Sequence, residues 1–170
     1  MEIRRRLIQI ALAAMVVPAA WLAMAPAAQA QAFQRFTPLL IDLPGWQGDK
    51  PDGVAMEIPG SSMITATREY QRGDARLNAQ VLIGAQAQGA AAAAATGIKV
   101  ETSEARMSTT TIDGLPVTRT YTFKDKAGAV MVILGPSAVF MFTFAGVAED
   151  EGLKLARQFN WKTMQAAIPK

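Results

Sequence analysis

The chain has 170 residues, of which 17 are basic, 14 are acidic and none is cysteine or histidine. The absence of both residue types excludes Ser-His-Asp and Cys-His catalytic sites, thiol redox chemistry and Cys/His zinc clusters. Hydrophobic residues make up 51% of the chain, and much of this excess lies in the first thirty residues. The other 140 residues suffice for one domain, but not comfortably for two.

Residues 1–30 have the layout of an export signal. Three arginines near the start precede an uncharged run, Leu7–Gln34, that contains a small-x-small triplet ending in Ala30. This order predicts a signal peptide that is cleaved after Ala30. An uncleaved anchor is the alternative, because the apolar run approaches the about 20 residues that span a bilayer, although Pro18 and Pro26 interrupt it as a helix. We expect a periplasmic or secreted protein that meets the membrane only through this segment, if it stays uncleaved.

The charge balance beyond the signal is nearly neutral. Because residues 1–30 hold three arginines and one glutamate, the rest of the chain carries 14 basic and 13 acidic side chains. Nucleic-acid binding requires a clustered basic face, so we expect no nucleic-acid partner. No motif for a cofactor is present, and we expect none to be bound.

The segment 31–45 leads into the domain. Pro38 is placed to begin a short helix with Thr37 as its N-cap. The sequence Leu43-Pro44-Gly45-Trp46 then breaks that helix with a turn. We expect Trp46 to cover one edge of the core, and residues 46–170 to form a single domain.

Alternating patterns predict strands over most of the domain. Residues 62–71 and 75–83 alternate on either side of Arg72-Gly73-Asp74, which is typical of a hairpin, although Arg68 interrupts the apolar face. Asp113-Gly114 is a second hairpin turn. Residues 54–58 are expected to be at most a short extended piece. Further strands are expected at residues 98–101, 106–112, 115–123, 129–134 and 138–145.

Two helices complete the predicted fold. Residues 85–96 are nearly all alanine, which suits a tightly packed crossover helix or a loosely ordered loop, and we favour the helix. Residues 149–159 begin with three acids and carry bases later, as a helix dipole favours. Residues 161–168 form a short tail or one further turn. The order predicts an α+β fold with an antiparallel sheet of about five to seven strands, an Ala-rich crossover helix and a C-terminal helix.

This arrangement resembles a known group of proteins. Leu43-Pro44-Gly45-Trp46 after a signal peptide, a strand ending in Tyr70-Gln71-Arg72-Gly73-Asp74, and Ile112-Asp113-Gly114-Leu115-Pro116-Val117 carry the resemblance. Together with Gly128 and the strand around Phe140–Phe144, they resemble a family of small, mostly uncharacterised exported bacterial proteins. More distantly, the chain is similar to the PsbP/DcrB-like fold. The resemblance covers about residues 43–168 and implies a fold and a compartment, but no catalytic residues.

A phenylalanine stripe is the main candidate for a binding surface. Phe140, Phe142 and Phe144 share one face of a predicted central strand. They are expected to form core, or alternatively to line a pocket for a lipid or another hydrophobic ligand. The other face of that strand is also largely apolar, so either the Ala-rich helix or a partner protein must cover it.

Other candidate sites have simpler explanations. Arg72-Gly73-Asp74 spells an integrin-binding tripeptide, but glycine and aspartate suit the turn. The acids at 149–151, and those at 49 and 52, lack calcium-loop spacing. No serine lies in a G-x-S-x-G or S-x-x-K motif. If the first hairpin lies beside the 115–123 strand, four arginines form a modest patch for an anionic headgroup or an acidic partner; they are Arg68, Arg72, Arg76 and Arg119.

These observations favour a non-enzymatic envelope protein that binds a partner protein or supports assembly. It would act through a sheet face or through the region around Trp46. A carrier of a small hydrophobic ligand that uses Phe140, Phe142 and Phe144 is the first alternative. The second is an enzyme with an unrecognised carboxylate or Ser/Lys site.

Overall fold

The computed structural model describes residues 32–94, 97 and 99–169. In this part of the chain nine strands form one sheet, in which all neighbouring strands run antiparallel. The fold is α+β and mostly β. The predicted signal peptide and its cleavage point lie outside the described residues.

The elements follow the predicted order with more strands than expected. The strands are β1 (Gln47–Gly48), β2 (Asp52–Ile58), β3 (Ser61–Arg72), β4 (Ala75–Gly84), β5 (Lys99–Glu101), β6 (Ala105–Ile112), β7 (Leu115–Thr122), β8 (Ala127–Gly135) and β9 (Ala138–Ala145). The helices are the 3-10 turn η1 (Thr37–Leu39), α2 (Ala85–Ala94), α3 (Glu149–Ala156) and α4 (Trp161–Ala166). The predicted five to seven strands are too few, because β1 has two residues and leaves no periodic signal, and because β2 is a full strand.

The strand order is β1-β3-β4-β9-β8-β7-β6-β5, and β2 also pairs with β3. The hairpin turns explain much of this order. Asp113 and Gly114 both have positive φ, as a two-residue type I′ turn requires, and Gly73 has a positive φ at the first position of the β3–β4 turn. Each turn joins neighbouring strands, while α2 carries the chain from β4 to the far edge at β5.

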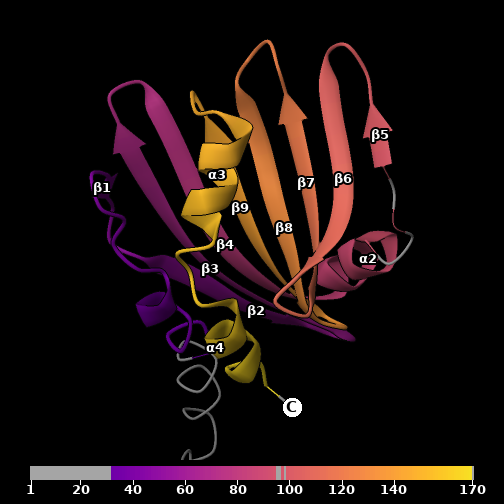
Figure 1. Cartoon of the computed structure of the whole chain (residues 1–170). Helices are drawn as coiled ribbons and strands as arrows, with labels where there is room; N and C mark the ends of the chain where they lie inside the picture. Colours follow the sequence, from indigo (N-terminus) through magenta and orange to yellow (C-terminus); the bar gives the residue numbers. More distant parts are fainter. Residues whose placement is uncertain (1–31, 95–96, 98, 170) are drawn as a thin grey trace, which may run out of the picture.

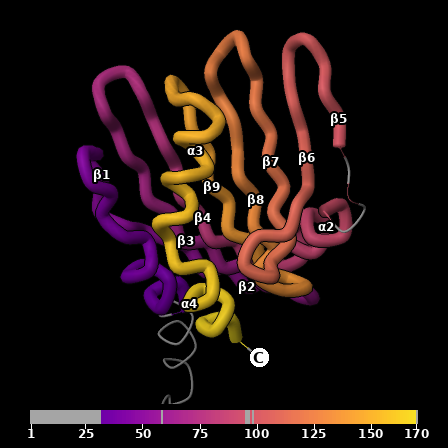
Figure 2. Tube along the Cα trace, viewed as in Figure 1, coloured from indigo at the N-terminus to yellow at the C-terminus, as the bar shows by residue number. Residues whose placement is uncertain are grey.

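The helices divide between the two faces of the sheet. Helices α3 and α4 lie against the face that carries Phe140, here called the helix face (Figures 1 and 2). Val139 points to the opposite face, here called the open face, and is fully buried where α2 packs against β4 and β9. The predicted crossover helix is therefore confirmed over residues 85–94, while residues 95 and 96 lie outside the described part.

Two predicted helix boundaries are wrong. The 149–159 helix ends at Ala156, and Asn160 begins α4 instead, because its side-chain oxygen accepts a hydrogen bond from the Thr163 amide at 3.0 Å. Thr37 caps no helix, since its hydroxyl donates to the Gln34 carbonyl at 3.0 Å and only the 3-10 turn forms.

The main core fills the helix face. Buried side chains of the central strands meet α3, α4 and the leading segment, from which Phe36, Leu40 and Leu43 join the same cluster. The ring of Phe144 fits between two glycines, because a Cβ at Gly128 or Gly152 would come within 2.6 or 2.4 Å of its Cζ. Small residues on β8 and α3 therefore let the helix approach the sheet closely.

Tyr70 links the core to the leading segment, and its titration lowers the free energy of unfolding at alkaline pH. Its hydroxyl donates to the Ile41 carbonyl at 2.7 Å, and burial raises the pKa of Tyr70 to about 12. The neutral phenol is thus favoured in the folded state. This contribution is complete below the unfolded pKa of about 10 and is lost as pH rises through about 12.

Tyr70→Phe is therefore expected to reduce the loss of stability at alkaline pH. Between about pH 9.5 and 12 the natural protein should lose about 2–3 kcal/mol more unfolding free energy than the variant. Urea unfolding across this pH range measures the difference, with the variant correcting for the titration of lysines. Parallel pH profiles for the two proteins would contradict the assignment.

Candidate binding surface

The phenylalanine stripe lies inside the molecule. Phe140 and Phe142 are fully buried, and Phe144 is 4% exposed. The ring of Phe159, which follows α3, lies 5.2 Å from that of Phe140 and 5.7 Å from that of Phe142, centroid to centroid. The stripe is thus the layer on which the C-terminal helices pack.

Trp46 is shielded from solvent by a cation. The indole is 8% exposed, and the guanidinium of Arg72 lies 4.2 Å above its ring. Arg72, the last residue of β3, also donates to Glu151 at 2.6 Å, which links β3 to α3. Trp46 therefore covers one edge of the core. The side chain of Arg72 lies over it, and no sequence pattern predicts this contact.

The four arginines considered as a patch do not come together. The first hairpin lies beside β9, and both β9 and β8 separate it from β7. Arg68 donates to the Leu40 carbonyl in the leading segment, and Arg72 lies over Trp46, which follows that segment. Arg76 is exposed on the open face, and Arg119 lies on β7. The condition for the patch is not met, because β9, the last strand of the chain, is inserted between β4 and β8.

Methionines collect on the open face. Strand alternation places five of the six methionines that the structure describes on this side, while the sixth, Met164, is in the core. Met131 pairs directly with Met141, and Met56 with Met63. Exposure reaches 50% at Met56 and 37% at Met107.

Two adjacent rows of side chains make up the uncovered centre of this face. The first row is Val100, Met107, Thr120, Ala129, Thr143 and Asn78; the second is Thr109, Thr118, Met131, Met141, Gln80 and Thr67. We call these twelve residues the methionine face. None of them is charged, and charges begin at its rim with Glu69, Arg76 and Asp52.

Hydrogen bonds within the methionine face reduce its polarity. The hydroxyls of Thr109 and Thr118 lie 3.0 Å apart, and the Asn78 amide donates to the Thr67 hydroxyl at 3.2 Å. Four of the seven polar side chains of this face therefore satisfy one another, and the other three, Thr120, Thr143 and Gln80, lie among the five apolar ones. A solvent-facing sheet side usually carries polar and charged side chains, so the lack of charge is unusual for a face that no helix of the described residues covers.

Helix α2 borders the methionine face at one end. It covers Val139, and a hollow of about 180 Å³ lies where α2 begins, lined by Met56, Met63, Ser61, Ser62, Ala85 and Gln86. Met56 belongs to β2, which the sequence presented as little more than a loop. The apolar character of the open face thus continues past its centre toward the β2 edge.

Three of the five acids considered for metal binding have other partners. Glu149 accepts from Arg106 at 3.2 Å and Glu151 from Arg72 at 2.6 Å, while Asp52 accepts from the Gly53 amide at 2.7 Å. Within residues 32–94, 97 and 99–169, no three His, Cys, Asp or Glu side chains lie close enough together to hold a metal ion. Turn geometry and ion pairs account for these carboxylates.

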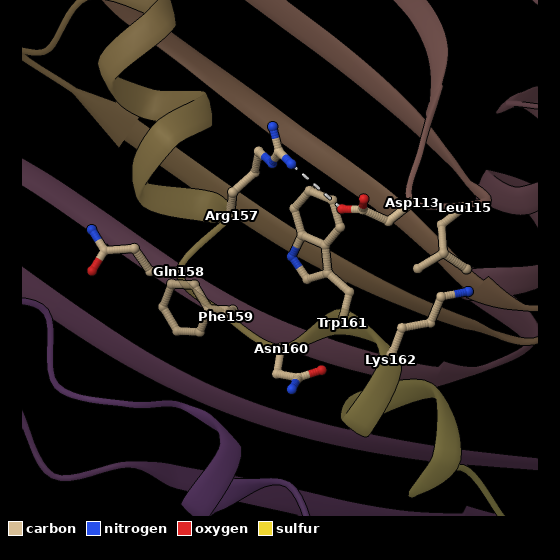
Figure 3. A pocket seen from close by; sticks show the side chains of 8 residues that line it. All are labelled: Asp113, Leu115, Arg157, Gln158, Phe159, Asn160, Trp161 and Lys162. Carbon is tan, nitrogen blue, oxygen red and sulfur yellow. Dashed lines mark ion pairs between the residues drawn. The ribbon is translucent and has the colours of Figure 1, made fainter.

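A separate hollow lies at the end of α3 (Figure 3). Its volume is about 300 Å³, and its lining is Asp113, Leu115, Arg157, Gln158, Phe159, Asn160, Trp161 and Lys162. Arg157 and Asp113 form an ion pair at 3.6 Å across this lining. Three of the eight lining residues are apolar, and the other five are polar or charged.

Comparisons with known proteins give no relative. No family model matches the chain, and neither a curated protein nor a solved structure does. Over the residues that the structure covers, no helix is long and apolar enough to cross a lipid bilayer.

Proposed function

We propose that the protein is an exported, non-enzymatic binding module that recognises a partner protein through the methionine face. The observation that carries this proposal is the uncharged double row of side chains across the open face. Five of its twelve side chains are apolar and gain by leaving water, and the seven uncharged polar ones cost less to desolvate than charged groups would. Unbranched, polarisable methionine side chains adapt to partners of different shape, which suits a module for assembly.

The dimensions of the face indicate a transient complex. Seven strands from β5 to β3, about 4.8 Å apart, give a width of about 29 Å, and two rows give a height of about 14 Å. The resulting area of roughly 400 Å² is below the about 800 Å² per partner of a standard interface. We therefore expect a partner with an uncharged, apolar surface that binds weakly and reversibly.

The proposal places this module in the bacterial envelope. The basic, apolar and small-residue order of residues 1–30 supports export, and a periplasmic or secreted partner follows from it. A PsbP/DcrB-like assignment of the fold is part of the same proposal. The hairpin, the crossover helix α2, the antiparallel strands and the closing helices support it.

A double substitution tests the proposal. Met131→Glu with Met141→Glu puts two charges at the centre of the face, where both side chains are partly exposed. Native mass spectrometry of protein purified from its host should show a partner mass with the natural chain and lose it with the variant. Gln158→Glu, an exposed change on the helix side, is the control and should keep the partner. A bare monomer from the natural chain, or a partner retained by the double variant, would refute the proposal.

A further inference from the structure

Among the described residues, no helix lies along β5, β6 and β7 on the helix face. Helix α3 packs against β8 and β9, and strands β5, β6 and β7 extend past it on the same side (Figures 1 and 2). A hollow of about 330 Å³ runs along α3 and is lined by Asp150, Leu153, Lys154 and Arg157. Arg157 also lines the hollow at the end of α3, so the two adjoin. We use the term α3 groove for these two hollows, which α3 and the residues after it mostly line, together with the neighbouring β6 and β7 side chains between the Arg106–Glu149 and Arg157–Asp113 ion pairs.

Two ion pairs fix α3 beside these strands. Arg106 of β6 donates to Glu149 at 3.2 Å, and to Glu101 at 2.9 Å, near the start of the helix. Hydrogen bonding and charge from Glu101, and charge from Glu149 and Asp150, raise the pKa of Arg106. At the other end, Arg157 pairs with Asp113. These four carboxylates and two arginines frame the groove.

Arg119 lies on β7 between these two ion pairs. Along β7, Tyr121 lies beside Arg106 at one ion pair, and Leu115 lies next to the turn that holds Asp113 at the other. Arg119 lies between them, two residues from Tyr121 and four from Leu115. Its residue partner across the ladder is Ser108. Alternation turns both side chains to the helix face, beside the middle of α3.

Both side chains carry buried polar atoms without a partner. Among the described residues, neither the Arg119 Nε nor the Ser108 Oγ makes a hydrogen bond, although both atoms are buried. The guanidinium forms no ion pair in that part of the chain, yet the residue is half-buried. A half-buried arginine normally has an acceptor, because leaving its donors unmet is unfavourable. An acceptor from outside the chain would meet this need.

The charge of the α3 groove favours an anion. Among the described residues, three basic side chains of the groove have no carboxylate within ion-pair distance: Arg119, Lys154 and Lys162. One acidic side chain of the described groove, Asp150 of α3, likewise has no basic partner at that distance. The unpaired charge of the groove is therefore positive. A guanidinium fork and a hydroxyl suit a tetrahedral oxyanion, which accepts several hydrogen bonds at once.

We propose that the α3 groove binds a phosphate group, with Arg119 and Ser108 as its central ligands. Lys154 and Arg157 flank the site on α3 and attract the anion. The hollows along and beyond α3 leave space for the remainder of a small phosphorylated molecule or of a lipid headgroup. This site is separate from the methionine face, which lies on the other side of the sheet.

Nuclear magnetic resonance of the exported protein tests the site with inorganic phosphate and glycerol 3-phosphate. The Arg119 Nε–H signal should shift saturably at millimolar ligand, while the Trp46 indole signal, from an equally unpartnered buried donor, should not move. Arg119→Gln and Ser108→Ala should weaken binding, the former about tenfold or more, as read from backbone amides of β6 and β7. Arg76→Gln removes the same charge from the open face and should change nothing.

Vesicles separate the two sources of phosphate. Cosedimentation with phosphatidylglycerol vesicles that depends on Arg119 would identify a lipid headgroup, whereas a response to soluble phosphate alone would identify a free ligand. An unmoved Arg119 signal with every probe, or binding that persists unchanged in Arg119→Gln, would overturn the proposal.

Discussion

Replacing Phe142 with alanine is expected to lower the free energy of unfolding by about 3–5 kcal/mol. Phe142 is fully buried, and its ring lies 5.7 Å from that of Phe159 and 6.4 Å from that of Phe144. Its neighbours across the ladder, Ala79 and Val130, are also buried, so little can move into the cavity that alanine would leave. Urea unfolding followed by circular dichroism measures the loss.

The same variant distinguishes core from ligand pocket. Phe123→Ala is the control, because Phe123 is 37% exposed and its loss should cost less than about 1 kcal/mol. If Phe142→Ala retained natural stability and instead lost a bound hydrophobic molecule, the stripe would be a carrier site. That result would contradict the packing described for β9 and the C-terminal helices.

Arg68→Ala is expected to release the leading segment and to lower the unfolding free energy by about 3 kcal/mol. The guanidinium donates to the Leu40 carbonyl at 2.8 Å and to the Asp49 carbonyl at 2.7 Å. It also lies 5.2 Å from the centre of the Tyr70 ring. Its ion pair with Asp42 adds little, because that carboxylate is 91% exposed. The two backbone carbonyls thus carry most of the effect.

Hydrogen exchange locates the consequence of this substitution. Amides of residues 36–46 should exchange faster in Arg68→Ala, while those of β8 and β9 keep their protection relative to global unfolding. Arg76→Ala, an exposed arginine on the neighbouring strand, should change stability by less than about 0.5 kcal/mol. Unchanged exchange near Leu40 would show that the segment is held by its own apolar side chains.

The hairpins could be predicted because their turns carry the information. Asp113-Gly114 sets the register of β6 and β7, and that register alone makes Ser108 face Arg119. The α3 groove could therefore have been found in part from the sequence. The position of α3 could not be predicted, because it depends on packing against residues far away in the sequence, above all Gly152 against the ring of Phe144.

The register of β8 and β9 could not be predicted in the same way. A bulge between Ile133 and Gly135 shifts the pairing by one residue, so that Met131 faces Met141. Without this shift Met131 would lie opposite Phe142, on the wrong face. The bulge therefore places Val130 and Val132 of β8, rather than Met131 and Ile133, beside the phenylalanine stripe.

Arg68 illustrates why an interrupted pattern can mislead. In the sequence it breaks the apolar face of a strand, as a charge at a sheet edge would. Its acceptors, carbonyls 28 and 19 residues earlier, are backbone atoms that no side-chain pattern reveals. One sequence feature did indicate the methionine face: the second face of the 138–145 strand is also largely apolar and so requires a cover. Helix α2 supplies that cover only at Val139.

Photo-crosslinking in the host envelope tests the central proposal most directly. A benzophenone amino acid at Thr120, in the centre of the methionine face, should crosslink the exported protein to a partner protein. The crosslink should disappear when Met131→Glu and Met141→Glu are added, and the same probe at exposed Gln158 should not form it. Equal crosslinking at positions 120 and 158, or none at position 120, would contradict a partner-binding role for this face.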